Sequence, residues 1–344
     1  CVLDTGWREK MNRLLFPFLL SGCITLDALL PFHGNIPCTE VTQETCNVED
    51  PWDAFCDVCE DYEPGPWWTR DYAWREITLD TLSSIRSIET DFKRVPFTTE
   101  DGQYQLDAWF LPSHGEEASL AKTTVVFNHG RKGGIEHYAP RVRFFHELGY
   151  NVYIWDYRGY GSSLPVDPAE EPGPPATPDW MTDARQAFLE AKELAPDAEK
   201  MIVYGMSVGG MPGGEMADVY DDVTCANMFE ASFNSISSKV ETNLALSIPG
   251  SHITSGLIEN EVKLSDATTP TLIMHGTLDD RIHIDEAKTL YDALPEDLPK
   301  EWVVIEGAGH GLGKEGGVPE QGLGAYGAIL KSFLEDKAPD CLEI

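Results

Sequence analysis

Basic residues are scarce in this sequence. Its 344 residues include only 25 Lys and Arg against 58 Asp and Glu, which gives a formal net charge of −33 at pH 7. This charge repels polyphosphates and anionic lipid surfaces over a Debye length of roughly 8 Å in physiological salt, so nucleic acid is a poor candidate partner. We expect the acidic residues to form a solvated surface, and we assign them no metal-binding role.

Long apolar runs are also lacking. Residues 14–32 are apolar, but Pro17, Asp27 and Pro31 interrupt them, and the stretch is barely long enough to cross about 30 Å of hydrocarbon. An amphipathic segment packed on a domain fits better than a spanning helix. The sequence has no internal repeat, and its 42% of hydrophobic residues is ordinary for a globular protein with a packed core.

Cysteine is absent between residues 60 and 224 and crowded at the beginning of the chain. Six of the eight cysteines lie in the first 60 residues: Cys1, Cys23, Cys38, Cys46, Cys56 and Cys59. The last four of these could form a zinc site, but the seven residues between Cys38 and Cys46 exceed the usual ligand spacing. Disulfides formed in an oxidising compartment fit this acidic, loop-like segment better.

The first residues indicate a lipid anchor. The chain starts at Cys1 without a Met, as a mature bacterial lipoprotein does after its signal peptide is removed. Cys23 is a competing anchor, because residues 11–23 read as a short basic start, an apolar run and Leu-Ser-Gly-Cys. With Cys1 lipidated and Cys225 a buried thiol in a core strand, six cysteines remain for three bridges. We therefore expect a secreted or cell-envelope protein, attached to the membrane through a lipid on Cys1 or Cys23.

Two parts of the chain differ in composition. Residues 1–75 form a Cys- and Trp-rich extension without a catalytic pattern, which we expect disulfides to staple. Residues 76–344 alternate β-rich runs with helical stretches, which is typical of βα units on a mostly parallel sheet. Within them, the six prolines of residues 164–178 predict an exposed loop, and residues 232–267 predict a short cap over the site.

The apolar runs predict eight strands and the helical spacing predicts four helices. The strands are expected at residues 95–99, 104–111, 123–128, 151–155, 201–204, 225–229, 271–274 and 302–305. A turn at residues 100–102 joins the first two as a hairpin. The helices are expected at residues 139–148, 179–194, from about 210 to 220, and 321–337.

The pentapeptide Gly-Met-Ser-Val-Gly at residues 205–209 directly follows a predicted strand and precedes a predicted helix. A serine hydroxyl is a weak nucleophile at neutral pH and needs a base within hydrogen-bond reach. A sharp strand-to-helix turn exposes such a serine, and flanking glycines let neighbouring segments approach it. This context predicts that Ser207 is a nucleophile rather than part of a Gly-rich turn without chemistry.

Candidates for the acid and the base follow later in the chain. Asp279 and His310 lie just beyond the last two predicted strands, and glycines flank His310. The chain order Ser, Asp, His at successive strand ends predicts a catalytic triad of the α/β type. Asp280 and Glu230 are rival acids, and we expect His275 to be structural.

Charge that develops on an attacked carbonyl oxygen needs fixed hydrogen-bond donors, and losing one costs about 3–4 kcal/mol of transition-state stabilisation. The backbone amide of Val208, next to the predicted nucleophile, is one candidate. The backbone amide of Arg131, after His129-Gly130 at the end of the third predicted strand, is the other. The side chain of Arg131 receives no role.

These motifs together resemble the α/β-hydrolase superfamily, in particular its Bem46-like and serine-aminopeptidase-like (S33) branch. In chain order they are FNHGRKGG, WDYRGYGSS, GMSVGG, HGTLDDRI and GAGHG. The resemblance implies a mostly parallel eight-stranded sheet flanked by helices, no metal or organic cofactor, and an acyl-enzyme reaction in which His310 takes the Ser207 proton. Arg131-Lys132 departs from the smaller residues common in that loop, and the Cys-rich extension has no counterpart.

Three functions are compatible with these residues. The leading hypothesis is a serine hydrolase that cleaves carboxylic esters of small molecules. A serine aminopeptidase or amidase is the alternative, because a similar triad can cleave amides; it would need an acidic pocket for the substrate's amino group. The intact Ser207, Asp279 and His310 argue against a non-catalytic binding module on a hydrolase scaffold.

Overall fold

A computed structural model describes the part of the chain that the sequence predicts to be an α/β domain. The described residues are 93–113, 123–131, 134–138, 141–142, 145–146, 148–170, 172, 175–195, 200–232, 234–235, 258–310 and 323–342. The predicted extension, with its cysteines and both candidate lipid anchors, lies outside the described residues. So does most of the predicted cap.

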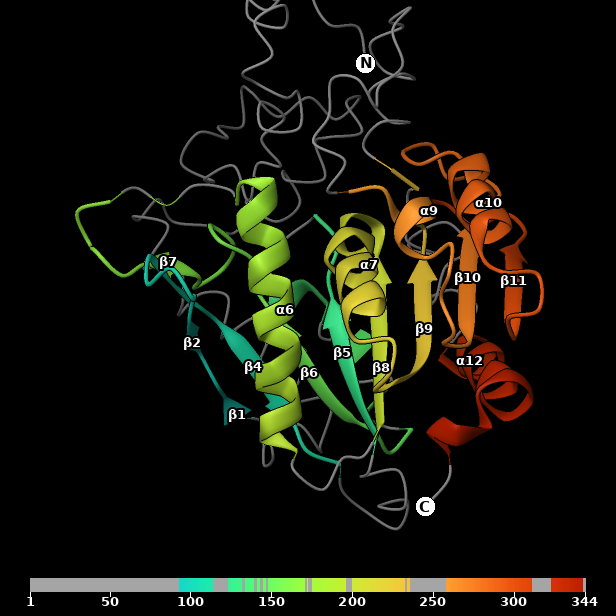
Figure 1. Cartoon of the computed structure of the whole chain (residues 1–344), viewed down its shortest axis with the longest axis horizontal. Helices are drawn as coiled ribbons and strands as arrows, with labels where there is room; N and C mark the ends of the chain where they lie inside the picture. The colour runs from blue at the N-terminus through green and yellow to red at the C-terminus, as the bar shows by residue number, and fades with distance from the viewer. Residues whose placement is uncertain are drawn as a thin grey trace, which may run out of the picture.

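A mostly parallel sheet of eight strands forms the centre of the domain, as the sequence predicts (Figure 1). In spatial order the strands are β1 (Lys93–Arg94), β4 (Ala108–Leu111), β6 (Asn151–Trp155), β5 (Thr123–Asn128), β8 (Lys200–Met206), β9 (Thr224–Glu230), β10 (Thr271–Gly276) and β11 (Lys300–Ile305). The last six run parallel, whereas β4 is antiparallel to β1 and β6. The carboxyl ends of β5, β6, β8, β9, β10 and β11 therefore share one edge.

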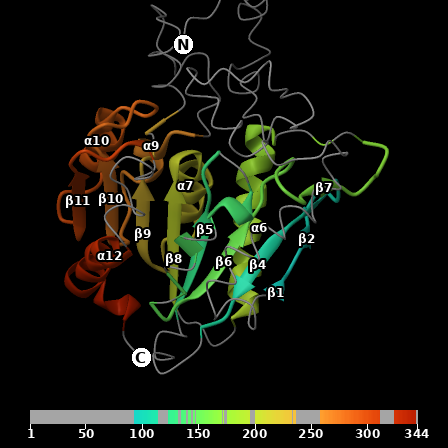
Figure 2. The same ribbon diagram turned by 180° about the vertical axis from the view of Figure 1, so that it is seen from behind.

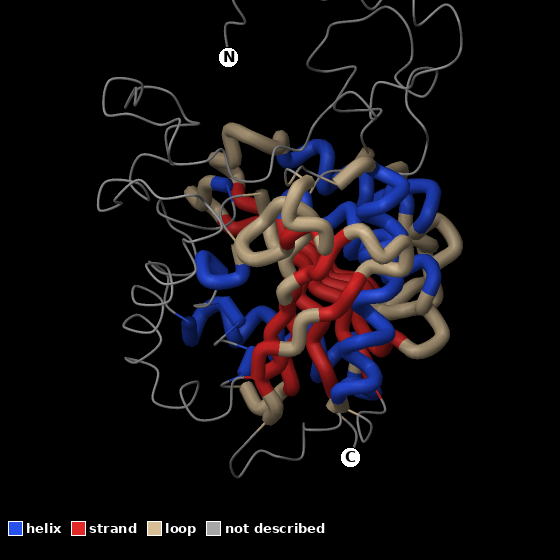
Figure 3. The backbone as a smooth tube through the Cα atoms, turned by 90° about the vertical axis from the view of Figure 1, so that its left-hand side faces the viewer, coloured by secondary structure: helices blue, strands red, loops and turns tan. Residues whose placement is uncertain are grey.

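Helices cover both faces of the sheet, which explains why its central strands are buried along almost their whole length. On β5, Val126 packs with Trp180 of α6 (Thr177–Leu194), while Val125 and Phe127 pack in a cluster with Leu330 of α12 (Leu323–Lys337). Successive side chains of a strand point to opposite faces of the sheet. Since helices cover both faces, the side chains on both faces must be largely apolar. Figure 1 shows α6 and α7 (Gly210–Val219) in front of the sheet, and Figure 2 shows the arrangement from behind. In Figure 3 the strands gather in the middle with helices to either side.

A second, three-stranded antiparallel sheet carries the predicted hairpin. Its order is β2 (Phe97–Thr98), β3 (Tyr104–Leu106) and β7 (Leu164–Pro165), and Gly102 adopts a φ of +72° in the turn. The strand expected at residues 104–111 divides between the two sheets as β3 and β4. The strand expected at residues 95–99 is wrong in extent, because only β2 lies within it and β1 precedes it in the larger sheet. Pro96 has no amide hydrogen to offer a partner strand between β1 and β2. Between β3 and β4, the amide of Asp107 donates to the Ser163 hydroxyl at 2.8 Å instead.

The remaining helices agree with the sequence only in part. α6 begins two residues before its predicted start, and residues 141–142 and 145–146 of the predicted helix at 139–148 are helical. Short helices η4 (Ile135–Tyr138), η5 (Ser207–Gly209) and α9 (Asn260–Lys263), and the longer α10 (Ile284–Ala293), were not predicted. Within the described residues, none of the helices has the length and apolarity that a membrane span requires.

A disulfide joins Cys225 of β9 to Cys341 of the short helix η8 (Pro339–Cys341), with their Cα atoms 5.4 Å apart. The expectation that Cys225 is a buried free thiol is therefore wrong, and so is the expectation that Cys341 pairs within a set of six that omits Cys225. The physical reason is that α12 returns the chain to the sheet, so η8 lies against β8 and β9. The bridge closes a separation of 116 residues.

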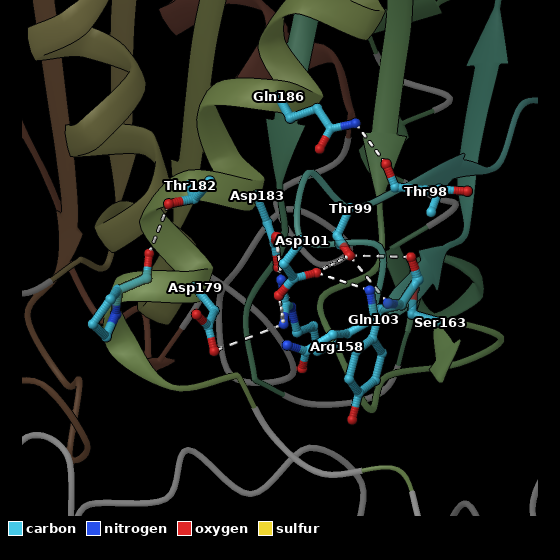
Figure 4. Close-up of polar contacts among 12 residues, drawn as sticks. Thr98, Thr99, Asp101, Gln103, Arg158, Ser163, Asp179, Thr182, Asp183 and Gln186 are labelled. Atoms are coloured by element: carbon cyan, nitrogen blue, oxygen red, sulfur yellow. Dashed lines mark hydrogen bonds and ion pairs between the residues drawn. The ribbon is translucent and has the colours of Figure 1, made fainter. Parts of the chain in front are cut away.

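An ion cluster around Arg158 ties the hairpin to α6 (Figure 4). Its guanidinium donates to both carboxylate oxygens of Asp183 at 2.7 and 2.9 Å and to Asp101 at 2.8 Å, and Asp179 lies 3.7 Å away. Burial raises the pKa of Asp183 to about 6, although the hydrogen bonds and charge of Arg158 oppose this rise. The cluster thus fixes the loop after β6 from two sides.

Candidate active site

Ser207 lies at the turn between β8 and η5, with its backbone in the left-handed region at a φ of +54°. The backbone packs so closely around the neighbouring glycines that neither position has room for a side chain. A Cβ atom on Gly205 would lie 2.8 Å from the Gly209 carbonyl oxygen, and one on Gly209 would lie 2.1 Å from the Asn128 carbonyl oxygen. The Ser232 hydroxyl donates to the Ser207 carbonyl at 3.1 Å. The left-handed backbone of Ser207 is strained, and such strain persists only where surrounding contacts enforce it. Here β5 and the segment after β9 supply those contacts.

The three side chains singled out as a triad come together at the carboxyl edge of the sheet. Ser207 Oγ lies 2.9 Å from His310 Nε2, and His310 Nδ1 lies 2.8 Å from Asp279 Oδ2. Ser207 follows β8, Asp279 follows β10 and His310 follows β11. Because a carboxylate only accepts, Nδ1 carries the ring proton, which leaves Nε2 to accept from the Ser207 hydroxyl.

Asp279 is held in place by its own turn and by a second histidine. Its Oδ1 accepts the amides of Arg281 and Ile282, each at 2.9 Å, and His275 Nε2 lies 3.1 Å from Oδ2. Burial raises the pKa of Asp279, but hydrogen bonds from His275, His310 and the Ile282 amide outweigh burial and hold it below the usual range. Asp279 is therefore a carboxylate at neutral pH.

The rival residues lie elsewhere. Asp280 is exposed. Glu230 is fully buried and engaged by Arg141, by the Tyr204 hydroxyl and by the Tyr326 hydroxyl at 2.5 Å. His275, expected to be structural, is fully buried and donates to the Ile282 carbonyl at 2.9 Å, beneath the Asp279 carboxylate.

The predicted oxyanion residues border Ser207. A Cβ atom on Gly130 would lie 3.4 Å from Ser207 Cβ, so the chain before Arg131 passes beside the serine. Val208 follows Ser207 in η5 and is buried. The Arg131 side chain is half-buried; burial lowers its pKa, Tyr160 opposes this and the charge of Arg281 adds to it.

Two groups behind this loop, His129 and Asp156, were not singled out from the sequence. They form a buried contact, with His129 Nε2 and Asp156 Oδ1 3.1 Å apart. They belong to the motifs FNHGRKGG and WDYRGYGSS, but only the pairing of β5 with β6 brings them together.

In the part of the chain that the structure describes, no cluster of three or more His, Cys, Asp or Glu residues could hold a metal ion. That the site works without a metal or an organic cofactor stays a prediction.

An eight-stranded, mostly parallel sheet with a serine at a strained strand-to-helix turn is the arrangement of α/β hydrolases. Family comparisons agree: residues 119–261 match the model of serine aminopeptidases, S33, and residues 255–322 match that of the prolyl oligopeptidase family. The chain belongs to the α/β-hydrolase superfamily, which confirms the resemblance seen in its motifs.

Individual relatives cover most of this domain. YfhR of Salmonella typhimurium, an uncharacterized protein, is 29% identical over 63% of this chain and 73% of its own length. The fold is similar to that of the Pyrococcus furiosus esterase Pf2001, with a TM-score of 0.54 and 19% identity over 74% of this chain and 93% of that one. It is also similar to an acylaminoacyl peptidase, with a TM-score of 0.53 and 19% identity over 72% of this chain and 42% of that one. Esterases and peptidases thus share this fold, and the two family models support a hydrolase.

Proposed function

We propose that the protein is a serine hydrolase that cleaves carboxylic esters of small molecules through Ser207, His310 and Asp279. One observation carries the proposal: a continuous hydrogen-bonded path from Ser207 Oγ to His310 at 2.9 Å and on to Asp279 at 2.8 Å. A base within hydrogen-bond reach of a serine, itself oriented by a carboxylate, is what nucleophilic catalysis requires.

In the proposed reaction, His310 Nε2 takes the Ser207 proton as Oγ attacks the ester carbonyl carbon. The tetrahedral intermediate collapses when His310 returns that proton to the leaving alkoxide oxygen, which releases an alcohol and leaves Ser207 acylated. Water then attacks the acyl carbon and gives a proton to His310, and the second collapse releases the carboxylic acid and restores the serine hydroxyl. The Asp279 carboxylate stabilises the imidazolium in both halves of the cycle.

The backbone amides of Val208 and Arg131 are the proposed oxyanion donors. Val208 follows the nucleophile at the start of a helical segment, and the chain before Arg131 passes beside Ser207 Cβ. Fixed amides need no reorganisation as charge develops, which is why such donors lower the barrier.

Cleavage of amides is the second candidate, because the matching family models are those of peptidases. An aminopeptidase must bind the ammonium group of its substrate. Arg131 stands next to Gly130 beside Ser207, and the charge of Arg281 is close enough to lower its pKa. A cationic residue directly after Gly130 disfavours an ammonium group near Ser207, so we place esters first.

The location of the protein is part of the proposal. A disulfide between Cys225 and Cys341 supports an oxidising compartment, as expected for a secreted or cell-envelope protein. Attachment through a lipid on Cys1 or Cys23 remains a proposal from the sequence.

Labelling with a fluorophosphonate, alongside turnover of p-nitrophenyl esters and aminoacyl amides, tests the chemistry. We expect the purified protein to be labelled once and to hydrolyse short esters. Ser207→Ala should abolish labelling and lower kcat by a factor on the order of 10⁶. Labelling that persists in Ser207→Ala would refute the nucleophile, and amide turnover without ester turnover would favour the peptidase.

A further inference from the structure

His129 and Asp156 form a buried pair directly behind the proposed oxyanion loop. The exposed fractions of their side chains are 0% and 1%, and Asp156 Oδ1 lies 3.1 Å from His129 Nε2. The same Oδ1 accepts the backbone amide of Ile135 at 2.9 Å. One carboxylate oxygen, anchored at the end of β6, therefore contacts the loop both before and after Gly130 and Arg131.

The contacts of His129 indicate which of its ring nitrogens carry hydrogen. Its Nδ1 is 2.7 Å from the Gly130 carbonyl oxygen, which can only accept, so Nδ1 carries a hydrogen. A neutral imidazole then has a bare lone pair on Nε2. Nε2 and Asp156 Oδ1 lie at ion-pair distance without the alignment of a hydrogen bond, and their contact is attractive only if one further proton is present, on the ring or on the acid.

The surroundings favour a pair that carries one further proton and no net charge. Burial raises the pKa of Asp156 well above its usual range and the charge of Asp107 adds to this, while the Ile135 amide and Arg94 oppose it. The rings of Tyr138 and Tyr157 stack on His129, with centroids 5.3 and 4.2 Å away, and that of Tyr160 meets it edge-on at 5.3 Å. Such a pair places no net charge among these buried rings, which avoids the cost of burying an uncompensated ion.

Close packing connects this pair to the turn that carries the nucleophile. Cβ atoms on Gly134 and Gly161 would lie 2.8 and 2.0 Å from Asp156 Oδ2, so the carboxyl fills its cradle. The Tyr157 hydroxyl donates to the His129 carbonyl at 2.6 Å. That carbonyl would lie 2.6 Å from a Cβ on Gly209, in the turn that carries Ser207.

We propose that Asp156 and His129 are positioning residues, whose one-proton contact holds the loop of Gly130 and Arg131 at the distance from Ser207 that stabilises the oxyanion. The inference rests on the proposed function and adds residues that touch neither substrate nor Ser207 Oγ.

Asp156→Asn tests this without a change of size. In this variant, the position of Oδ1 holds either the side-chain oxygen, which can accept from the Ile135 backbone amide, or the side-chain nitrogen, which can donate to His129 Nε2. It cannot make both contacts. We expect kcat for p-nitrophenyl butyrate to fall about 10- to 100-fold, part of the loss seen when an oxyanion donor is removed. KM should stay within about twofold, since the substrate carbonyl gains these bonds mainly in the transition state. A trifluoromethyl ketone, whose serine adduct carries an oxyanion, should bind more weakly by a factor similar to the loss in kcat.

Two further variants keep the test decisive. Asp221→Asn is the matched control, because Asp221 accepts hydrogen bonds from Thr268 and Thr269 before β10, at the amino edge of the sheet; its kcat and inhibitor affinity should equal those of the wild type. If Asp156→Asn does not fold, Tyr157→Phe removes only the hydroxyl that binds the His129 carbonyl, and it should lower kcat and inhibitor affinity together by a smaller factor.

The outcomes separate the two proposals. Wild-type kcat and inhibitor affinity in Asp156→Asn, or in Tyr157→Phe where that variant is used, would overturn the positioning role and leave the serine hydrolase intact. A lower thermal midpoint with unchanged kcat would also overturn it, because the pair would then only stabilise the fold. A wild-type protein that is neither labelled by a fluorophosphonate nor active on esters would refute the proposed function, and this inference with it.

Discussion

At the scale of single residues, the neighbours of Asp279 closely constrain its carboxylate. Two amides and two histidines surround its carboxylate and lower its pKa, so it stays ionised over the range in which a histidine titrates. Its role in the proposed reaction is to hold the His310 proton on Nδ1, which keeps Nε2 free to accept from Ser207.

Asp279→Asn should therefore lower kcat on esters by about 10⁴-fold, because an amide nitrogen can donate to Nδ1 and favour the wrong tautomer. Asp280→Asn is the natural control, since its exposed carboxylate should be dispensable. Steady-state kinetics of both variants measure this. Equal activity in the two would rule out Asp279 as the orienting acid.

The same carboxylate has a predictable effect on stability. Because its pKa is lower in the folded chain than the unfolded value of about 3.9, ionised Asp279 stabilises the fold above that pH, and the contribution is lost as pH falls below it. In Asp279→Asn, unfolding by denaturant should consequently depend less steeply on pH in this acidic range than in the wild type.

At the scale of elements, the disulfide between β9 and η8 fastens the end of the chain to the middle of the sheet. The Thr123 hydroxyl also donates to the Cys341 carbonyl at 2.9 Å, so η8 is tied to β5 as well. Closing so long a loop restricts the unfolded chain.

Replacing both Cys225 and Cys341 by Ala should lower the free energy of unfolding by about 2–5 kcal/mol. Thermal or urea unfolding of the wild type and the double variant measures the difference. Peptide mapping by mass spectrometry before and after reduction supplies the control, because it detects the bridge directly. A double variant as stable as the wild type would show that the bridge does not stabilise the fold.

The elements also show what sequence reasoning can and cannot reach. β5 was predictable because every residue before Asn128 is β-branched or aromatic, as is typical of a buried strand. α10 was not, since its N-cap is His283, whose ring accepts the Asp285 amide, whereas Ser, Thr, Asp and Asn are the usual caps. The Cys225–Cys341 bridge and the His129–Asp156 contact were out of reach for another reason: each depends on segments that meet only after strands pair. Ser207, Asp279 and His310 could be singled out because each follows a strand in a short glycine-bearing motif.

At the scale of the whole molecule, the excess of acidic residues sets how the protein responds to salt. With a formal net charge of −33 on 344 residues, the excess negative charges repel one another in any compact state. Local ion pairs relieve this only in part. The cluster around Arg158, for example, brings three carboxylates to one guanidinium.

We therefore expect the thermal midpoint of unfolding to rise as NaCl increases from about 10 mM to about 1 M, where the Debye length falls from about 30 to about 3 Å. Most proteins with balanced charge gain little from this salt, because screening weakens their attractive pairs as well as their repulsions. Scanning calorimetry at constant pH measures the shift, and KCl should reproduce it if screening rather than a bound sodium ion is the cause. A midpoint that stays constant or falls would mean that the surface carboxylates are already compensated within the fold.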